Sequence, residues 1–166
     1  MNRIIAEVLN KIAERQHQMK TVSFSNQAVP DEQIFVDYGN VTLQGVTLAL
    51  LIDLYRVDRS NHWVNWILQG ISYDVAFTFQ INPKMISFIP LRMLRDWPVV
   101  FEVGSTAHVV AFYQKSIGRS DLAVLPDNTI LIVTATQRLT SEAQAVMRQK
   151  HMIKQVRTDE DCIWQK

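Results

Sequence analysis

The sequence contains four histidines, the residue type that most often binds metal ions or transfers protons near neutral pH. They are His17, His62, His108 and His151. No two of them stand four residues apart, the spacing that places two metal ligands on one face of a helix. The five glycines are scattered and form no phosphate-binding loop. We therefore predict no metal site and no bound cofactor.

A nucleophile, a base and an orienting carboxylate are available only from separate stretches of the chain. Ser105, His108 and Asp121 form one such set, but no G-x-S-x-G turn surrounds the serine. The single cysteine, Cys162, follows three acidic residues, whose charge would raise its pKa and suppress the thiolate. We predict no catalytic residues and keep one alternative, an enzyme whose site is assembled by the fold.

Cationic and aromatic side chains offer candidate binding sites. Arg56 and Arg59 lie in a polar loop beside a helix start and could bind an anionic ligand such as a cyclic dinucleotide. The alternative is that they are two solvated charges. Trp63 and Trp66 stand three residues apart, either as an exposed anchor for a protein partner or as part of the core.

The charge balance and the apolar stretches limit the classes of partner. The chain has 17 basic and 16 acidic residues and a net charge of +1, so we predict no nucleic-acid binding. The N-terminus lacks the apolar core of a signal peptide. The most apolar stretch, residues 46–54, contains Asp53 and is far shorter than the roughly 20 residues that span a bilayer. We predict a cytoplasmic protein with no direct membrane insertion.

Apolar residues recur at helical spacing over residues 2–19, which predicts an amphipathic N-terminal helix. Residues 1–20 are assigned to it, either as an arm or as a part of the core. A second helix is predicted at 42–56, and a third, capped by Ser60 or Asn61, ends at Gly70. Alternation of apolar residues over 73–81 predicts a half-buried strand.

In the second half of the chain, Pro90 can open a short helix and Pro98 can end it before a strand at 99–103. The remaining predictions are a helix at 107–117, a hairpin of 121–125 with 129–136, a helix at 141–151, a strand at 153–156 and a loose tail at 158–166. Helices alternate with strands that include a hairpin. The predicted fold is therefore a single α+β domain, with a mixed or antiparallel sheet and helices on one face.

The stretch INPKMISFIPLRMLRDWPVV, residues 81–100, resembles a segment of the N-terminal domain of type II secretion and type IV pilus assembly ATPases. In that family an Ile-Asn/Asp-Pro sequence precedes a helix, and an I-P-x-x-x-x-R sequence leads into a strand. The matching positions are Ile81, Asn82, Pro83, Ile89, Pro90 and Arg95. Residues 127–156 are similar to the next unit of that domain, and the resemblance covers at most residues 62–157. Residues 102–125 are an addition to the family pattern.

The resemblance implies a domain that docks on a platform protein of the inner membrane. One branch of that family binds cyclic di-GMP through an R-L-G opening. This chain has Leu43, Gln44 and Gly45 there, without the arginine that would meet a phosphate.

Our first functional hypothesis is a noncatalytic adaptor or regulatory domain of a secretion or pilus-type machine, peripheral to the inner membrane through its partner. It would bind another protein through its N-terminal helix or through Arg92, Arg95 and Trp97. The second is a sensor of an anionic ligand at Arg56 and Arg59. Homo-oligomerisation is left open, because nothing in the pattern fixes the oligomeric state.

Overall fold

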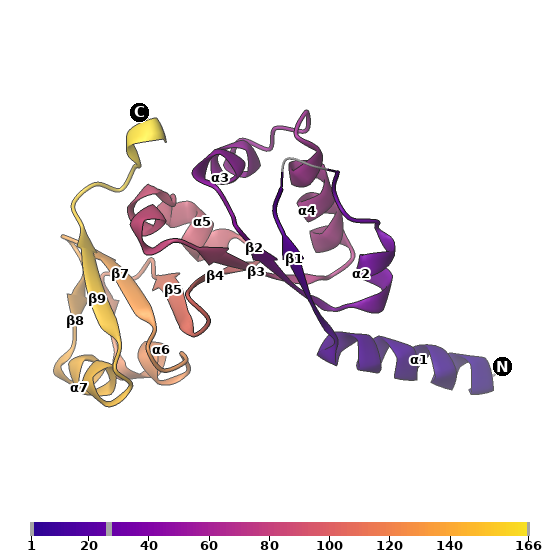
Figure 1. Ribbon diagram of the computed structural model, residues 1–166. Helices are drawn as coiled ribbons and strands as arrows, with labels where there is room; N and C mark the ends of the chain where they lie inside the picture. The colour runs from indigo at the N-terminus through magenta and orange to yellow at the C-terminus, as the bar shows by residue number, and fades with distance from the viewer. Residues whose placement is uncertain (1, 26–27, 166) are drawn as a thin grey trace. The chain divides into compact units, whose positions relative to one another are not determined.

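The computed structural model describes residues 2–25 and 28–165, whose contacts group into two compact units, Met1–Phe79 and Gln80–Lys166 (Figure 1). Each unit is described in turn. The prediction of a single domain over 1–166 stays a prediction. Two predicted segments, 1–20 and 158–166, each include a terminal residue, Met1 or Lys166, that lies outside the described residues.

The first unit is built on three parallel strands in the order β1-β2-β3. Its elements are α1 (Asn2–His17), β1 (Met19–Ser23), α2 (Gln33–Asp37), β2 (Asn40–Gln44), α3 (Leu48–Tyr55), α4 (His62–Ser72) and β3 (Ala76–Ile81), whose end carries the chain into the second unit. The predicted N-terminal helix and the strand before Asn82 are therefore confirmed. The helix capped by Asn61 is also confirmed, because the Asn61 side chain accepts a hydrogen bond from the Trp63 amide.

The core of the first unit lies on one face of these strands. Val41, Leu43, Phe77 and Phe79 are buried at period two, while the residues between them are partly exposed. The aromatic rings of α2 and α4 pack on this face. A side chain at Gly70 would meet Phe77 at 2.6 Å, so α4 needs a glycine in its interior where the sequence suggested a helix end.

The predicted helix over 42–56 is wrong in its first part. Residues 40–44 form strand β2, and α3 begins only at Leu48. Gly45, with φ of +70°, turns the chain between them, and the Thr47 side chain caps α3. Residues 40–44 form a strand although their spacing also fits a helix, because a strand places both Val41 and Leu43 on the buried face of the sheet.

The second unit contains a mixed sheet. Antiparallel β4 and β5 are followed by β7 and β9, each parallel to its neighbour. Its elements are the 3-10 helix η1 (Pro83–Phe88), α5 (Leu91–Asp96), β4 (Val99–Val103), β5 (Ala107–Ala111), β6 (Ser116–Ile117), α6 (Arg119–Ala123), β7 (Ile130–Thr134), β8 (Arg138–Leu139), α7 (Ser141–Gln149), β9 (Ile153–Arg157) and the 3-10 helix η2 (Ile163–Gln165). The α+β class with a mixed sheet is confirmed.

Two predictions for this unit are wrong. Residues 107–111 form β5, because Gly104, with φ of +66°, reverses the chain after β4 and pairs Phe101 with Val109. Residues 119–123 form α6, whose first turn is fixed by a hydrogen bond from the Gly118 amide to the Asp121 carboxylate. The predicted hairpin does not form, because its first strand is replaced by α6. This helix lies in the connection between β5 and β7, which run parallel.

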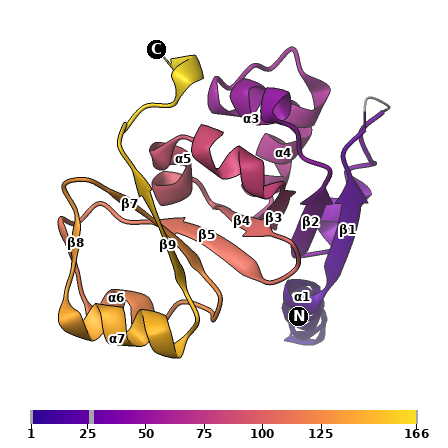
Figure 2. The ribbon, with the colours of Figure 1, turned by 60° about the vertical axis from the view of Figure 1, so that its left-hand side comes forward.

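Helices α6 and α7 lie side by side next to β7 and β9 (Figure 2). They bury Leu131 and Val133 of β7 together with Ile117, Leu122, Ala143, Val146, Met147 and Met152. All five residues of β7 are buried, as expected of a parallel strand covered on both faces. In the described part of the chain, no helix is long and apolar enough to cross a membrane.

Candidate functional site

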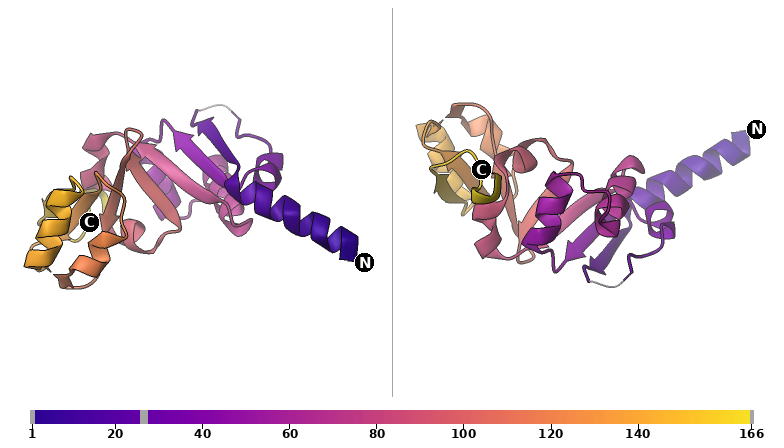
Figure 3. Two further views of the ribbon diagram at one scale, coloured as in Figure 1. Left: turned by 90° about the horizontal axis from the view of Figure 1, so that it is seen from below. Right: turned by 90° about the horizontal axis from the view of Figure 1, so that it is seen from above.

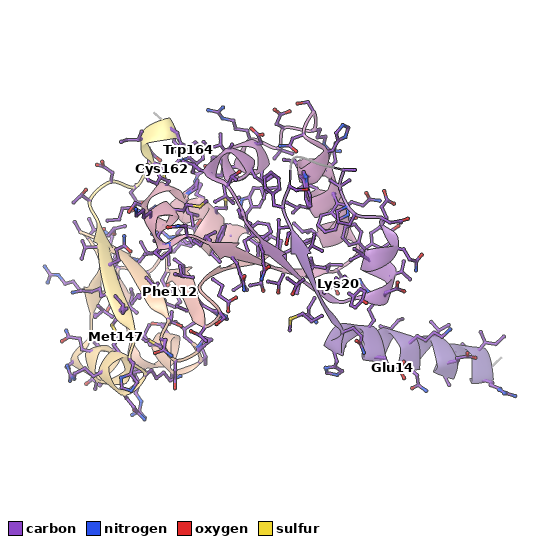
Figure 4. The ribbon with its side chains drawn as sticks, in the orientation of Figure 1. Glu14, Lys20, Phe112, Met147, Cys162 and Trp164 are labelled. Atoms are coloured by element: carbon purple, nitrogen blue, oxygen red, sulfur yellow. The ribbon has the colours of Figure 1, made fainter. Side chains whose placement is uncertain are left out.

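The apolar face of α1 is uncovered. Its large side chains are exposed by 70% at Ile4, 53% at Ile5, 49% at Val8, 59% at Leu9 and 45% at Ile12. They recur at spacings of three and four residues and so form one stripe along the helix. The helix projects from the rest of the first unit in Figures 1 and 3, and Figure 4 shows its side chains, Glu14 among them, standing clear.

The last turn of α1, in contrast, is fixed to the unit. Arg15 donates hydrogen bonds to the carbonyls of Phe35, at 2.8 Å, and Tyr73, at 2.7 Å. The Arg15 carbonyl in turn accepts the Gly39 amide at 2.8 Å. Gly39 is required there, because a Cβ would lie 2.7 Å from the Arg15 oxygen. The helix is therefore held at its C-terminal end in one direction.

A groove of ≈ 350 Å³ lies where α1 meets α2 and the end of α4. It is lined by Val8, Lys11, Ile12, Arg15, Phe35, Val36 and Tyr73. Val36 and Tyr73 are exposed by 55% and 48%, so the apolar stripe of α1 continues onto the body of the unit. Sequence reasoning missed these two residues. The run of three apolar residues Ile34, Phe35 and Val36 between Gln33 and Asp37 was the available signal, since consecutive residues of a short helix cannot all face the core.

The two tryptophans proposed as partner anchors are core residues. Trp63 is 6% exposed and donates its indole N–H to the Ser25 carbonyl at 2.9 Å. Trp66 is 3% exposed and packs on Phe35 and Phe77. They line clefts of ≈ 490 Å³ and ≈ 450 Å³ respectively, but neither indole offers the exposed ring that an anchor requires. The anchor interpretation is corrected accordingly.

Arg92, Arg95 and Trp97, the other proposed binding residues, differ in exposure. Arg92 is exposed and Trp97 is half-buried. The Arg95 side chain is only 7% exposed and lies over the Tyr113 ring, 4.7 Å from its centroid, with Glu160 at 3.5 Å. Tyr113 donates a hydrogen bond to Asp96, which raises the pKa of the phenol. Arg95 thus joins α5 to a loop and to the C-terminal segment.

The residues considered for nucleophilic catalysis have other partners. The Asp121 carboxylate accepts the Gly118 amide at 2.7 Å, and His108 lies 3.9 Å from Glu102. Ser105 is exposed in the turn between β4 and β5. Among the described residues no three His, Cys, Asp or Glu side chains gather as a metal site would require.

Comparison with protein families shows which family the chain resembles over most of its length. The family model described as "Putative propanediol utilisation" matches residues 3–153. The chain belongs to this propanediol-utilisation-like family. Comparison with curated proteins and with solved structures returns no match.

Membership of the propanediol-utilisation-like family corrects the resemblance to secretion and pilus ATPases. That resemblance rested on residues 81–100 and 127–156, and the family model covers the first stretch in full and the second as far as residue 153. The local structure there is ordinary: Asn82 caps η1, Pro90 precedes α5, and Thr140 caps α7. Such cap and proline positions recur wherever short helices follow strands, so they do not identify a family.

The propanediol-utilisation-like match includes the region around α1 but not the C-terminal segment that Arg95 contacts. It begins at Arg3, so α1 from its second residue on, the groove and the Gly39 contact all lie within it. Glu160 and the C-terminal segment lie beyond its end at residue 153.

The C-terminal segment, expected to be loose, packs on η1 (Figure 4). Trp164 donates its indole N–H to the Phe88 carbonyl at 2.9 Å, and Cys162 is 4% exposed, with its Sγ 3.7 Å from the Ser87 carbonyl oxygen. Burial, the largest cause, raises the pKa of the Cys162 thiol; Arg157 opposes this and Asp161 adds to it. The sequence analysis predicted the direction of this pKa shift correctly but attributed it to the acidic neighbours alone.

Arg56 and Arg59, the candidate anion ligands, are both exposed in the loop between α3 and α4. Arg56 ends α3, and the Arg59 carbonyl accepts a hydrogen bond from the side-chain Nδ2 of Asn65 at 2.6 Å. Ligand binding by their guanidinium groups stays a prediction.

Proposed function

We propose that this member of the propanediol-utilisation-like family is a noncatalytic protein-binding component, and that it binds through the apolar face of α1. The observation that carries the proposal is the combination of an uncovered apolar stripe with a fixed last turn. Contiguous exposed apolar surface on a folded protein marks an interaction site. A helix held in one direction presents that surface without the entropy cost of ordering it on binding.

The size of the face supports binding of a polypeptide. The five large side chains of α1 expose about 500 Å² of surface, which corresponds to roughly 12 kcal/mol of apolar transfer free energy at about 25 cal/mol per Å². Association itself costs about 4–15 kcal/mol. The stripe alone would therefore bind a polypeptide weakly. Burial of Val36 and Tyr73 in the adjoining groove would add to the binding free energy.

Recognition of an amphipathic helix by a complementary apolar surface is an established mode of protein recognition. The family description indicates the process in which to look for the bound protein, namely propanediol utilisation. The noncatalytic part of the proposal is supported by the partners that Asp121 and His108 already have.

The test is affinity capture by the tagged full chain from a lysate of source cells grown on propanediol. Leu9→Glu places a charge on the apolar face, and Asn10→Glu places the same charge on the opposite, polar face as a matched control. We expect the wild-type chain and Asn10→Glu to capture the same polypeptide and Leu9→Glu to lose it. Equal capture by all three chains would refute the role of the α1 face.

A further inference from the structure

We infer that the polypeptide covering α1 is a second copy of this chain, with the two α1 helices packed side by side in opposite directions. The inference rests on the proposed function, since it names the occupant of the same surface. Symmetric association through one shared surface is the commonest form of oligomer, and it requires that the surface be complementary to itself. The α1 region meets this requirement in three respects.

The first respect is the distribution of apolar surface along α1. The N-terminal end carries the most exposed side chain of the stripe, Ile4, followed by Ile5, and these have no part in the groove. The groove lies at the C-terminal end, beside Ile12 and next to Val36 and Tyr73. Pairing in opposite directions brings the N-terminal isoleucines of one copy to the groove of the other. Ile5 and Ile12 are equally far from the midpoint between Val8 and Leu9, so each lies opposite the other.

The second respect is charge. Glu7 and Lys11 stand one turn apart, on the edge of the apolar stripe that faces the groove. In an arrangement centred between Val8 and Leu9, Lys11 of one copy lies about one residue from the height of Glu7 of the other. A parallel two-fold arrangement would instead set this edge against the opposite edge of the other copy's stripe, so Glu7 and Lys11 would not pair across the interface.

The third respect is area. Two α1 stripes together bury about 1,000 Å², near the lower limit for a specific interface. The groove side chains Val36 and Tyr73 add to this area in both copies. A helix from another protein would have to supply an apolar stripe and an adjoining groove of its own to bury the same area.

The experiment uses the purified full chain. Sedimentation equilibrium should give a dimer for the wild-type chain. Leu9→Glu should raise the dissociation constant at least 100-fold, and Asn10→Glu should leave it within threefold. Leu9 is 59% exposed, so its replacement spares the core, and an unchanged circular dichroism spectrum checks this. A chain that is monomeric up to millimolar concentration, or a dimer indifferent to Leu9→Glu, would overturn the inference.

Disulfide trapping tests the direction of pairing. Under oxidation, a mixture of the Ile5→Cys and Ile12→Cys chains should cross-link, whereas Ile5→Cys alone should not, because two such residues lie about 10 Å apart along the axis. A Cys162→Ser background removes the natural thiol. Cross-linking of Ile5→Cys to itself would indicate parallel helices and overturn the inference. If the pure chain is monomeric but Leu9-dependent capture from lysate persists, the second-copy inference fails and the proposed function stands; loss of both refutes both.

Discussion

The contact between Gly39 and the last turn of α1 leads to a quantitative prediction for Gly39→Ala. A Cβ at this position would lie 2.7 Å from the Arg15 carbonyl oxygen and 2.9 Å from the Gln16 Cα. Both are backbone atoms, so neither can turn aside as a side-chain tip could. Ordinary contact begins near 3.4 Å, and α1 would have to shift by about 0.7 Å.

Two opposing free-energy terms decide the outcome for Gly39→Ala. Crowding of this kind costs about 1–3 kcal/mol. Restriction of the unfolded chain by alanine stabilises by about 0.4–1 kcal/mol. We expect a net destabilisation of about 1–2 kcal/mol, which lowers the melting temperature by roughly 2–8 °C in a chain of this length. The shift also moves the α1 stripe relative to the groove and should weaken association.

Urea unfolding followed by tryptophan fluorescence measures this destabilisation, since Trp63 and Trp66 lie in the core of the same unit. Gly118→Ala is the matched control, because a Cβ there would meet nothing nearer than the Asp121 carboxylate at 3.7 Å. We expect the control to remain within about 0.5 kcal/mol of the wild-type chain. A Gly39→Ala chain as stable as the wild type would show that the contact does not hold α1.

Three further predictions concern single residues. Arg15→Met removes the donor to two backbone carbonyls and should cost about 1–2 kcal/mol, with faster hydrogen exchange in the last turn of α1; unchanged exchange would contradict the anchoring role. Gly70→Ala should destabilise the first unit by about 1–2 kcal/mol in urea unfolding, because its Cβ would lie within 2.8 Å of two buried phenylalanine rings; the opposite sign, expected from helix propensity, would contradict this. Cys162 should react with iodoacetamide more slowly than an unfolded-chain thiol at pH 8.5, since burial raises its pKa. The folded chain favours the protonated thiol, so the contribution of Cys162 to stability is complete below about pH 8.5 and is lost as pH rises through the pKa of the folded chain. Equal alkylation rates in the folded and unfolded chains would contradict the burial of this thiol.

Helix ends with a local chemical signal were predictable from the sequence. Asn61 marks the start of α4 because its side chain bonds the helix's own amide, an interaction within three residues. The alternation through Phe77 and Phe79 identified β3 for the same reason, since period two is a local property. The amphipathic pattern of α1 was likewise sufficient to predict the helix and to nominate it for binding.

The failures depended on contacts between distant residues. The formation of strand β5 by residues 107–111 depends on pairing with β4 and β7, which no local pattern reports. The burial of Trp63 and Trp66 depends on which helix face meets Phe35 and Phe77. The groove beside Val36 and Tyr73 depends on contacts that hold α1 against the unit, among them the bonds from Arg15 to two carbonyls 20 and 58 residues away. Such sites follow from tertiary structure, and the sequence could nominate only the helix that forms one wall.

The bonds that fix α1 at its C-terminal end are made almost entirely to backbone atoms: the carbonyls of Arg15, Gln16, Phe35 and Tyr73 and the amide of Gly39. The attachment itself needs the side chains of Arg15 and Asn40 and a glycine at position 39, and none of these residues belongs to the apolar stripe. The stripe from Ile4 to Ile12 can therefore accumulate substitutions without loosening the helix from its support. The binding specificity proposed for this stripe would be free to evolve, or to be redesigned, independently of the fold that displays it.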